Sequence, residues 1–208
     1  MKEQNRSIKN LPLDGGVVCF DFINTVHSRK DEVVYDYLKS YDDFLIWCIK
    51  VNLLGSSEVN RLRTLSKSSG KETLKTFSKI IDAREILYEF FSNYSNNENV
   101  NEPLLVKFNK LLSESFSRLL LTQSKKEFEV DWKDRANLKY PLWMLIKSAY
   151  DLVFLYPRER IKECSACGWI FLDKSKNSSR KWCNMDTCGS NDKSLRYYYR
   201  KKAKQKVN

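Results

Sequence analysis

Apolar residues recur at helical spacing through most of the first three quarters of the chain. They fall three or four positions apart, which turns one face of each helix towards a core. Ser40 and Asp43 form a capping-box pattern before the first of these runs, and Pro103 and Pro141 stand where a helix begins. The pattern predicts helices from Ser40 to near Gly55, from Ser56 or Ser57 through Leu65, over 74–91, from Asn101 through Leu112 and over 142–155.

Two segments break the helical period. Residues 17–26 follow the Gly15-Gly16 turn signal and are largely β-branched or aromatic, which predicts a short β-rich or irregular segment. Residues 118–122 and 127–132 flank a polar turn at 123–126, a pattern typical of a β-hairpin. The expected fold class is therefore mainly α with a small β component, an α+β arrangement.

The chain is predicted to divide into two parts. Its 208 residues and 42% hydrophobic composition are enough for one sizeable core and a small appendage. Tyr156-Pro157 ends the last of the predicted helices, so we expect one domain over 1–157 and a second over 158–208. No apolar run reaches the roughly 18 residues that cross a bilayer, and residues 1–9 are too polar for a secretory signal. These features predict a cytoplasmic protein with no membrane partner.

The second part contains four closely spaced cysteines. They follow the pattern C-x2-C-x15-C-x4-C, which brings two pairs of thiolates together and is typical of a tetrahedral zinc site. Each pair is followed by a glycine, Gly168 or Gly189, where a tight metal knuckle favours a positive φ. The sequence therefore predicts one structural Zn²⁺ per chain, with the ligands Cys164, Cys167, Cys183 and Cys188.

Three other uses of these four cysteines remain open at this point. They are two disulfides, thiols that only pack, and iron–sulfur ligation. Disulfides require an oxidising compartment, which the expected location does not provide. The remaining two cysteines, Cys19 and Cys48, lie among apolar neighbours and are expected to be buried as small hydrophobic residues.

The cysteine segment is predicted to form a hairpin followed by a basic helix. Residues 169–172 alternate as a strand does, and residues 180–182 return as the second strand after a polar loop. Ser190 or Asn191 then caps a helix over about 192–204. At least one of the three consecutive tyrosines at 197–199 is expected to pack inward. The cations Lys193, Arg196, Arg200 and Lys204 share one face of this helix.

The formal net charge of +11 is concentrated in this segment. Residues 158–208 hold 14 Lys and Arg against 5 Asp and Glu, whereas residues 1–157 hold 23 against 21. Four thiolates and one Zn²⁺ would leave the C-terminal part near about +7. Such a density is the footprint of a polyanion-binding element. A basic tail that only aids solubility is the alternative.

Residues 164–189 resemble the bacterial CGNR zinc-finger family. That family joins this finger to an N-terminal ABATE domain, described as a stress-induced transcription regulator. Weaker matches lie at Cys19-Phe-Asp-Phe-Ile-Asn-Thr-Val26, in residues 43–47 and in residues 141–151. The resemblance implies that the four cysteines bind zinc and that the basic segment after Gly189 contacts nucleic acid.

One departure from the family pattern affects this implied contact. The family is named for Cys-Gly-Asn-Arg, whereas this chain has Cys188-Gly-Ser-Asn191, so Asn191 replaces the arginine. Zinc binding is unaffected, but any contact of that arginine with DNA would have to come from Lys193 or Arg196.

The expected function is DNA-binding transcription regulation, with double-stranded DNA as the partner. The basic residues expected to neutralise phosphates are Arg180, Lys181, Lys193, Arg196, Arg200, Lys201 and Lys202. Arg196 or Arg200 is the expected reader of base edges. The resemblance also implies a sensory region, so a small-molecule effector and a homodimer are expected for residues 1–157, with no ligand-binding residue assigned.

No catalytic constellation stands out in the sequence. His27 is the only histidine, and nothing in the sequence places a nucleophile or an orienting partner beside it. Gly-rich phosphate loops and the H-E-x-x-H motif are absent from the sequence. We therefore expect a protein that is not an enzyme.

Two other classes of function fit the same residues. Zinc, basic charge and tyrosines also suit an RNA-binding or ribosome-associated protein. A zinc-stabilised protein-interaction adaptor would need the basic tail only for solubility. Salt-dependent binding to DNA, to RNA or to neither separates the three classes.

Overall fold

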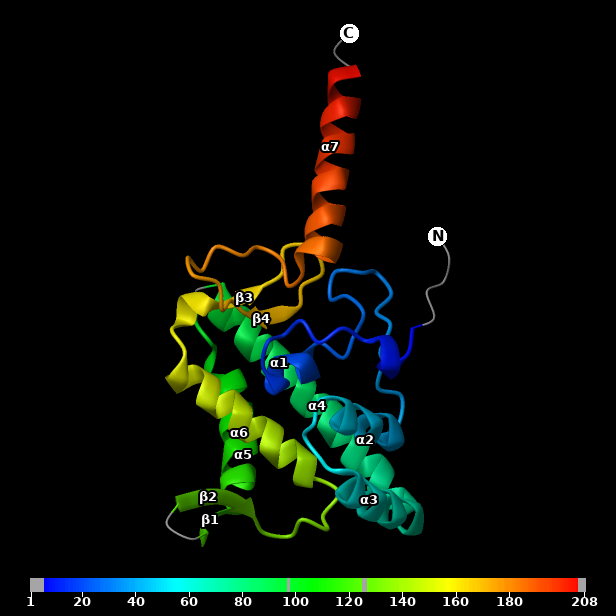
Figure 1. Cartoon of the computed structure of the whole chain (residues 1–208), viewed down its shortest axis with the longest axis vertical. Helices are drawn as coiled ribbons and strands as arrows, with labels where there is room; N and C mark the ends of the chain where they lie inside the picture. Colours follow the sequence, from blue (N-terminus) through cyan, green and yellow to red (C-terminus); the bar gives the residue numbers. More distant parts are fainter. Residues whose placement is uncertain (1–5, 97, 125–126, 206–208) are drawn as a thin grey trace.

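The computed structural model describes residues 6–96, 98–124 and 127–205 (Figure 1). Six helices and a hairpin form a body, and a seventh helix leaves it at the C-terminal end. The helices of the body are α1 (Val18–Ile23), α2 (Tyr41–Lys50), α3 (Ser56–Ser68), α4 (Gly70–Ser95), α5 (Glu102–Phe116) and α6 (Tyr140–Leu155). The remaining elements are β1 (Leu119–Ser124), β2 (Glu127–Trp132), β3 (Ile161–Glu163), β4 (Ile170–Leu172) and α7 (Ser190–Gln205), with short helical turns at Ile8–Asn10, Arg158–Arg160 and Met185–Gly189.

Helix α1 lies at the centre of the body, and the prediction of a β-rich or irregular segment over 17–26 was wrong. α1 contacts α4, α6 and β4, and its Cys19, Phe20, Phe22 and Ile23 are fully buried. A short helix buried on most sides has no polar face, so its sequence shows no helical period and looks like a buried strand.

The helix starts follow the predicted capping residues at α2 and α5 but not at α3 and α7. The Ser40 hydroxyl accepts a hydrogen bond from the Asp43 N–H, and the Asn101 side chain accepts one from Leu104. At α3 the prediction of Ser56 or Ser57 as the cap was wrong by one residue. Gly55 is the N-cap there, and its N–H donates to the Glu58 carboxylate. At α7 the prediction of Ser190 or Asn191 as the cap was wrong, because the helix continues from the turn at Met185–Gly189 and Ser190 is already helical, with φ −65° and ψ −43°.

The first predicted hairpin is confirmed, and it lies at the end of the body away from α7 (Figure 1). Strands β1 and β2 are antiparallel, with Leu119 opposite Trp132 and Ser124 opposite Glu127. Lys125 and Lys126, the last part of the predicted turn, lie outside the described residues.

The second hairpin differs from the prediction. Strand β4 confirms the strand expected over 169–172, but it pairs with β3, which precedes the first cysteine, and residues 180–182 are not a strand. The other edge of β4 is occupied by the N-terminal part of the chain, since the Leu172 N–H donates to the Gly15 carbonyl at 2.9 Å. Residues 180–182 therefore have no free edge of β4 to join.

The apolar core runs without a break from the helical body into the β3–β4 hairpin. Ile161, Ile170, Phe171 and Leu172 are buried in the same cluster as the side chains of α1, α2 and α4. The division of the chain at residue 157 into two domains stays a prediction.

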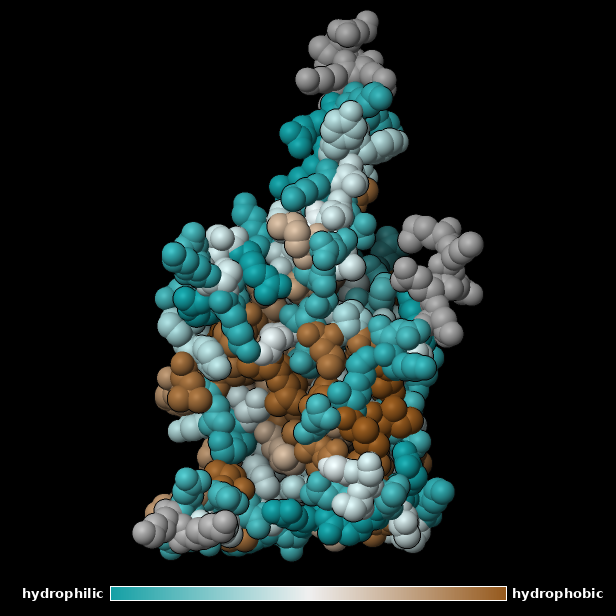
Figure 2. Space-filling model, viewed as in Figure 1, coloured by the Kyte–Doolittle hydropathy of each residue, from teal (hydrophilic) through white to brown (hydrophobic). Residues whose placement is uncertain are grey.

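Helix α7 projects from the body along the long axis of the molecule (Figure 1). Most of the side chains on it are hydrophilic, whereas apolar side chains gather over the body (Figure 2). In the described part of the chain, every helix is too short or too polar to cross a membrane.

Candidate metal centre and nucleic-acid interface

The four C-terminal cysteines meet at one point of the structure. Their Sγ atoms all lie within 4.8 Å of one another, and the Sγ–Sγ separations from Cys183 to Cys167 and to Cys188 are both 3.7 Å. Four sulfurs about 2.3 Å from one tetrahedral ion would be about 3.8 Å apart, whereas a disulfide requires about 2.05 Å, and all six cysteines are free. The donor set and its spacing fit one zinc ion, and Zn²⁺ is the structural cofactor of the chain.

The sulfur atoms strongly perturb one another. Hydrogen bonds from Cys167, Cys183 and Cys188 lower the pKa of Cys164. Hydrogen bonds with the other three sulfurs of the cluster, that of Cys164 first, raise the pKa of Cys183. Thiolates at these separations repel one another, and a bound divalent cation compensates their charge. A cation at the centre would therefore allow all four sulfurs to be thiolates at the same time.

The first pair of cysteines is held in a tight turn that ends at Gly168. The Gly168 N–H donates to the Cys164 carbonyl at 2.9 Å, and Gly168 has the predicted positive φ, 74°. A Cβ atom at this position would lie 2.8 Å from the Cβ of Arg29. Both backbone conformation and lack of space therefore require glycine here.

The second pair is held by a short π-helical turn over Met185–Gly189 that leads directly into α7. The Asn184 side chain caps this turn by accepting hydrogen bonds from the N–H groups of Asp186 and Thr187. Gly189 does not have the expected positive φ. A Cβ there would lie 2.6 Å from the sulfur of Met185, an exposed and flexible side chain that would have to move. The continuous turn fixes the direction in which α7 leaves the metal centre.

The loop between the two pairs is organised by Asp173, which sequence reasoning missed. Its side chain is fully buried and accepts hydrogen bonds from Lys162 Nζ and from the N–H groups of Ser175 and Arg180. Burial raises the pKa of this carboxyl, but these bonds, with that from Lys162 foremost, bring it well below its ordinary value. The Asp-Lys-Ser sequence allows such an Asx turn, but it does not reveal that the carboxylate is buried.

The N-terminal segment binds the hairpin through Asn24. The Asn24 side chain accepts a hydrogen bond from the Ile170 N–H at 3.0 Å and donates to the Ile170 carbonyl at 2.8 Å. The indole of Trp169 donates to the Val26 carbonyl at 2.9 Å. The sequence alone does not show that the partner of Asn24 is the backbone of a strand residue 146 positions away.

Residues 28–30 bind the first cysteine pair. The Arg29 N–H donates to the Cys167 carbonyl at 2.7 Å, and Lys30 Nζ donates to the Ser165 carbonyl at 2.9 Å. The Arg29 guanidinium lies over the Tyr88 ring of α4, with 4.1 Å to the ring centroid, and pairs with Glu85. The metal centre is thus fixed to α4 through this segment.

His27 lies beside the segment that binds the first cysteine pair, and its ring contacts a tyrosine. Its Nδ1 is 3.3 Å from the Tyr37 hydroxyl, and burial lowers its pKa, as does the charge of Arg6. Cys19, the thiol nearest to it in sequence, is fully buried, and burial raises the pKa of that thiol well above its ordinary value.

The predicted nucleic-acid residues fall into two groups in the structure. Five of them lie on α7 and are exposed: Lys193, Arg196, Arg200, Lys201 and Lys202. Arg196 pairs with Asp192 one turn earlier, at 2.9 Å. The Lys204 side chain lies outside the described part of the chain.

Arg180 and Lys181 form the second group at the foot of α7. Together with Arg196 and Lys162, they line a groove of about 550 Å³ that also contains several serines. The Arg180 guanidinium donates to the Cys183 carbonyl and lies over the Phe171 ring, with 4.9 Å to the ring centroid, so it is fixed beside the metal centre. Lys181 is exposed. The groove therefore gathers positive charge where α7 meets the body.

The three consecutive tyrosines of α7 are all exposed. Tyr197, Tyr198 and Tyr199 have relative exposures of 68%, 57% and 63%, so the expectation that one packs inward was wrong. The reason is that α7 projects away from the body (Figure 1).

Two family models match adjacent parts of the chain. The ABATE model, described as "Putative stress-induced transcription regulator", matches residues 16–154, and the CGNR zinc-finger model matches residues 160–201. The first match covers the helical body and the second covers the metal centre with most of α7. No curated protein matches the chain.

Proposed function

Because the chain belongs to the ABATE family and carries a CGNR zinc finger, we propose that it is a DNA-binding transcription regulator in which the zinc-bound turn directs α7 into DNA. The family description gives the coarse function, and the surface of α7 supports the finer one. Zinc supplies cross-linking of the two cysteine pairs. The residues of the chain provide the contacts with DNA.

The observation that carries the proposal is the complete exposure of a positively charged helix. α7 is 16 residues long, which corresponds to about 24 Å, and the side chains of 193–202 are all exposed. An isolated helix of this length is marginally stable in water, and like charges at Arg196 and Arg200, four residues apart, weaken it further. Phosphates would remove this repulsion, and the major groove of about 12 Å admits one helix.

The two groups of cations have different roles in this proposal. Arg180 and Lys181 flank the groove at the foot of α7 and contact the phosphate backbone, as do Lys193, Lys201 and Lys202 farther along. Arg196 and Arg200 lie on one face of α7 and are the readers of base edges. Asn191 is exposed in the first turn of α7, so an arginine there would add a cation near the same backbone.

Salt-dependent binding tests this proposal. The logarithm of duplex affinity should fall linearly with the logarithm of salt concentration, with a slope of about −4 to −6 for five to seven phosphate contacts. Lys201→Ala should reduce the slope by about one for every sequence. Arg196→Ala should cost about 1–3 kcal/mol on the cognate site alone, and Asn191→Arg should tighten binding. An affinity that does not depend on salt would refute the proposal.

The exposed tyrosines favour a second candidate function, RNA binding. Aromatic side chains stack on unpaired bases, and each stack contributes about 1–3 kcal/mol. Replacing Tyr197, Tyr198 and Tyr199 by leucine would then weaken binding to single-stranded RNA much more than binding to duplex DNA. An adaptor, the third class, would bind neither nucleic acid in a salt-dependent way.

The remaining parts of the proposal concern the setting of the protein. We place it in the cytoplasm, without catalytic activity and with the helical body as the site of dimerisation. Light scattering of the zinc-loaded protein measures the mass of the particle directly. A monomer at micromolar concentration would remove dimerisation from the proposal.

A further inference from the structure

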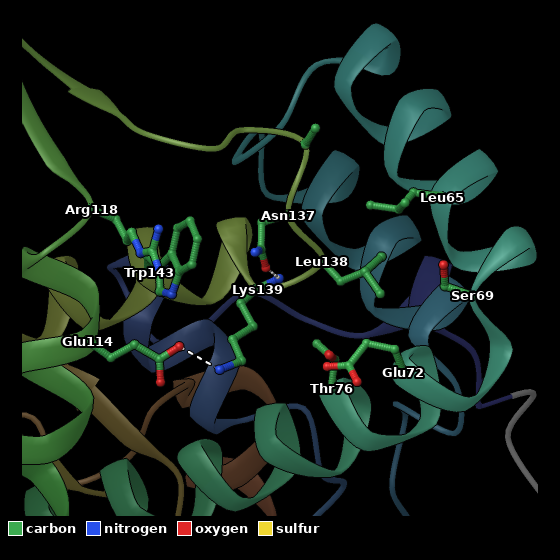
Figure 3. Close-up of a pocket in the computed structure, with 11 residues that line it drawn as sticks. Leu65, Ser69, Glu72, Thr76, Glu114, Arg118, Asn137, Leu138, Lys139 and Trp143 are labelled. Atoms are coloured by element: carbon green, nitrogen blue, oxygen red, sulfur yellow. Dashed lines mark hydrogen bonds and ion pairs between the residues drawn. The ribbon is translucent and has the colours of Figure 1, made fainter.

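The body contains a cavity of about 310 Å³ at its end away from α7 (Figure 3). It lies between α3, α4, α5 and the segment before α6, and its volume is at the lower end of the range for small-molecule sites, about 300–1,000 Å³. We propose that this cavity binds a small zwitterion of the α-amino acid type. This inference concerns the body alone and does not depend on DNA binding.

The floor of the cavity is apolar. Leu138 and Trp143 are 5% and 2% exposed, and the half-buried Leu65 completes this surface. These side chains provide a place for an aliphatic or aromatic group of the ligand. Polar groups line the rest of the cavity, as is usual for sites that orient a small molecule.

The charged residues of the lining cancel in sign. Glu72 and Glu114 face the cavity together with Arg118 and Lys139 (Figure 3). A ligand with a net charge of either sign would therefore meet as much repulsion as attraction. A molecule that carries both charges at separate ends is favoured instead.

One carboxylate of the lining is free to bind a cation. Lys139 Nζ lies 2.6 Å from the Glu114 carboxylate, and this pairing, against the effect of burial, holds the pKa of Glu114 below its ordinary value. Glu72 is exposed, and it has no ion pair and no hydrogen bond with any residue that the structure describes. Its carboxylate is the group that would bind the ammonium of the ligand, with the hydroxyl of Thr76 one turn along α4.

Two donors on another wall lack acceptors. Arg118 Nε and Trp143 Nε1 are buried without a hydrogen-bond partner in the described structure, and the Arg118 guanidinium carbon lies 5.5 Å from the centroid of the Trp143 ring. The outer end of the Arg118 guanidinium pairs with Asp134, so Nε is the atom of this group that lacks an acceptor. The indole N–H is one of the groups that lower the pKa of the nearby Glu114 carboxyl. The two groups are nevertheless not in hydrogen-bond geometry. A buried donor without an acceptor destabilises the protein. A ligand carboxylate at this wall would supply the missing acceptor.

The test compares whole zwitterions with their halves. The proteinogenic α-amino acids are titrated one by one into the zinc-loaded protein by calorimetry, beginning with leucine because of the apolar floor. 4-Methylpentanoic acid lacks the ammonium of leucine, and 3-methylbutylamine lacks its carboxylate. We expect at least one amino acid to bind. Each of its two half-molecules should bind at least tenfold more weakly, which corresponds to a loss of about 1.4 kcal/mol in binding free energy.

A matched pair of variants assigns the binding to this cavity. Glu72→Gln should weaken amino acid binding about tenfold, while Glu89→Gln, on an exposed position of the same helix outside the cavity, should leave it unchanged. Thermal unfolding of both variants controls for folding. The proposal is overturned if every amino acid fails to bind, if the halves bind as tightly as the whole, or if both variants behave alike. None of these outcomes bears on the DNA-binding proposal, whose measurement is separate.

Discussion

Helices α4 and α7 are both rich in charged residues, yet the structure stabilises them in different ways. α4 buries one full face, on which Ile80, Ala83, Leu87 and Phe91 are 0% exposed. α7 has no such face, and its one aliphatic side chain of substantial size, Leu195, is 55% exposed. The comparison teaches that α4 owes its stability to the core, whereas α7 depends on the metal centre at its foot and on a partner outside the chain.

Loss of the metal should produce the largest effect. Structural zinc sites contribute apparent binding free energies of about 10–16 kcal/mol, more than any single side chain of the body. In Cys183→Ser, zinc should fall from one ion per chain to none, and the 158–205 region should lose its order while most of the helical signal remains. Elemental analysis and circular dichroism measure the two quantities.

The control for this change is a cysteine outside the metal centre. Cys48→Ala alters a buried thiol of α2 and should keep one zinc per chain. An ordered C-terminal region in a protein free of metal would contradict the zinc assignment.

Removal of the whole C-terminal region tests the predicted division of the chain. A fragment ending at Pro157 should still unfold cooperatively, because the buried faces of α1 to α6 mostly pack on one another. Its melting temperature should be lower than that of the full chain, since Asn24 loses both of its bonds to Ile170. Aggregation or non-cooperative melting of the fragment would mean that the two parts share one inseparable core.

Matched leucine variants compare the two helices directly. Leu87→Ala in α4 leaves a cavity in the core and should destabilise the protein by about 2–5 kcal/mol. Leu195→Ala in α7 removes an exposed side chain and should change stability by no more than about 0.5 kcal/mol. Urea denaturation gives both values. Equal losses at the two positions would show that α7 packs on the body.

A dependence of stability on pH is expected at Asp21. Burial raises the pKa of this carboxyl to about 6, while the Gly15 N–H bonded to it acts in the opposite direction. The folded state therefore binds the proton more tightly than the unfolded state, so stability should fall as pH rises from about 4 to about 6. Asp21→Asn keeps an oxygen for Gly15 and should lose this dependence. An unchanged pH profile in the variant would refute the assignment.

The sequence predicted those parts whose pattern is local. Helix α4 has one apolar face, and the four cysteines stand at zinc-ligand spacing, so the sequence predicted both the helix and the metal site. Helix α1 was missed because burial on most sides removes the periodic signal. The β3–β4 pairing was missed because Gly15, which is far away in the sequence, occupies the edge of β4 that residues 180–182 were expected to join.

The site residues show the same limit. Asp173 is a polar residue after a strand, and only the folded structure places Lys162 against its buried carboxylate. The body cavity likewise joins Glu72, Arg118 and Trp143, which lie on three different segments. Long-range proximity of this kind has no signature in a single sequence.

The measurement that most directly tests the account is duplex DNA binding by a neutralised α7. One variant replaces the five described cations of α7 by glutamine, namely Lys193, Arg196, Arg200, Lys201 and Lys202. The matched control replaces five exposed lysines of the body, namely Lys71, Lys75, Lys79, Lys107 and Lys110.

Both variants must retain one zinc per chain, which shows that the metal centre is intact. The account predicts that the α7 variant loses measurable salt-dependent binding, while the body variant keeps nearly the slope of the unmodified protein. Equal binding by the two variants would contradict the central claim that α7 is the nucleic-acid element.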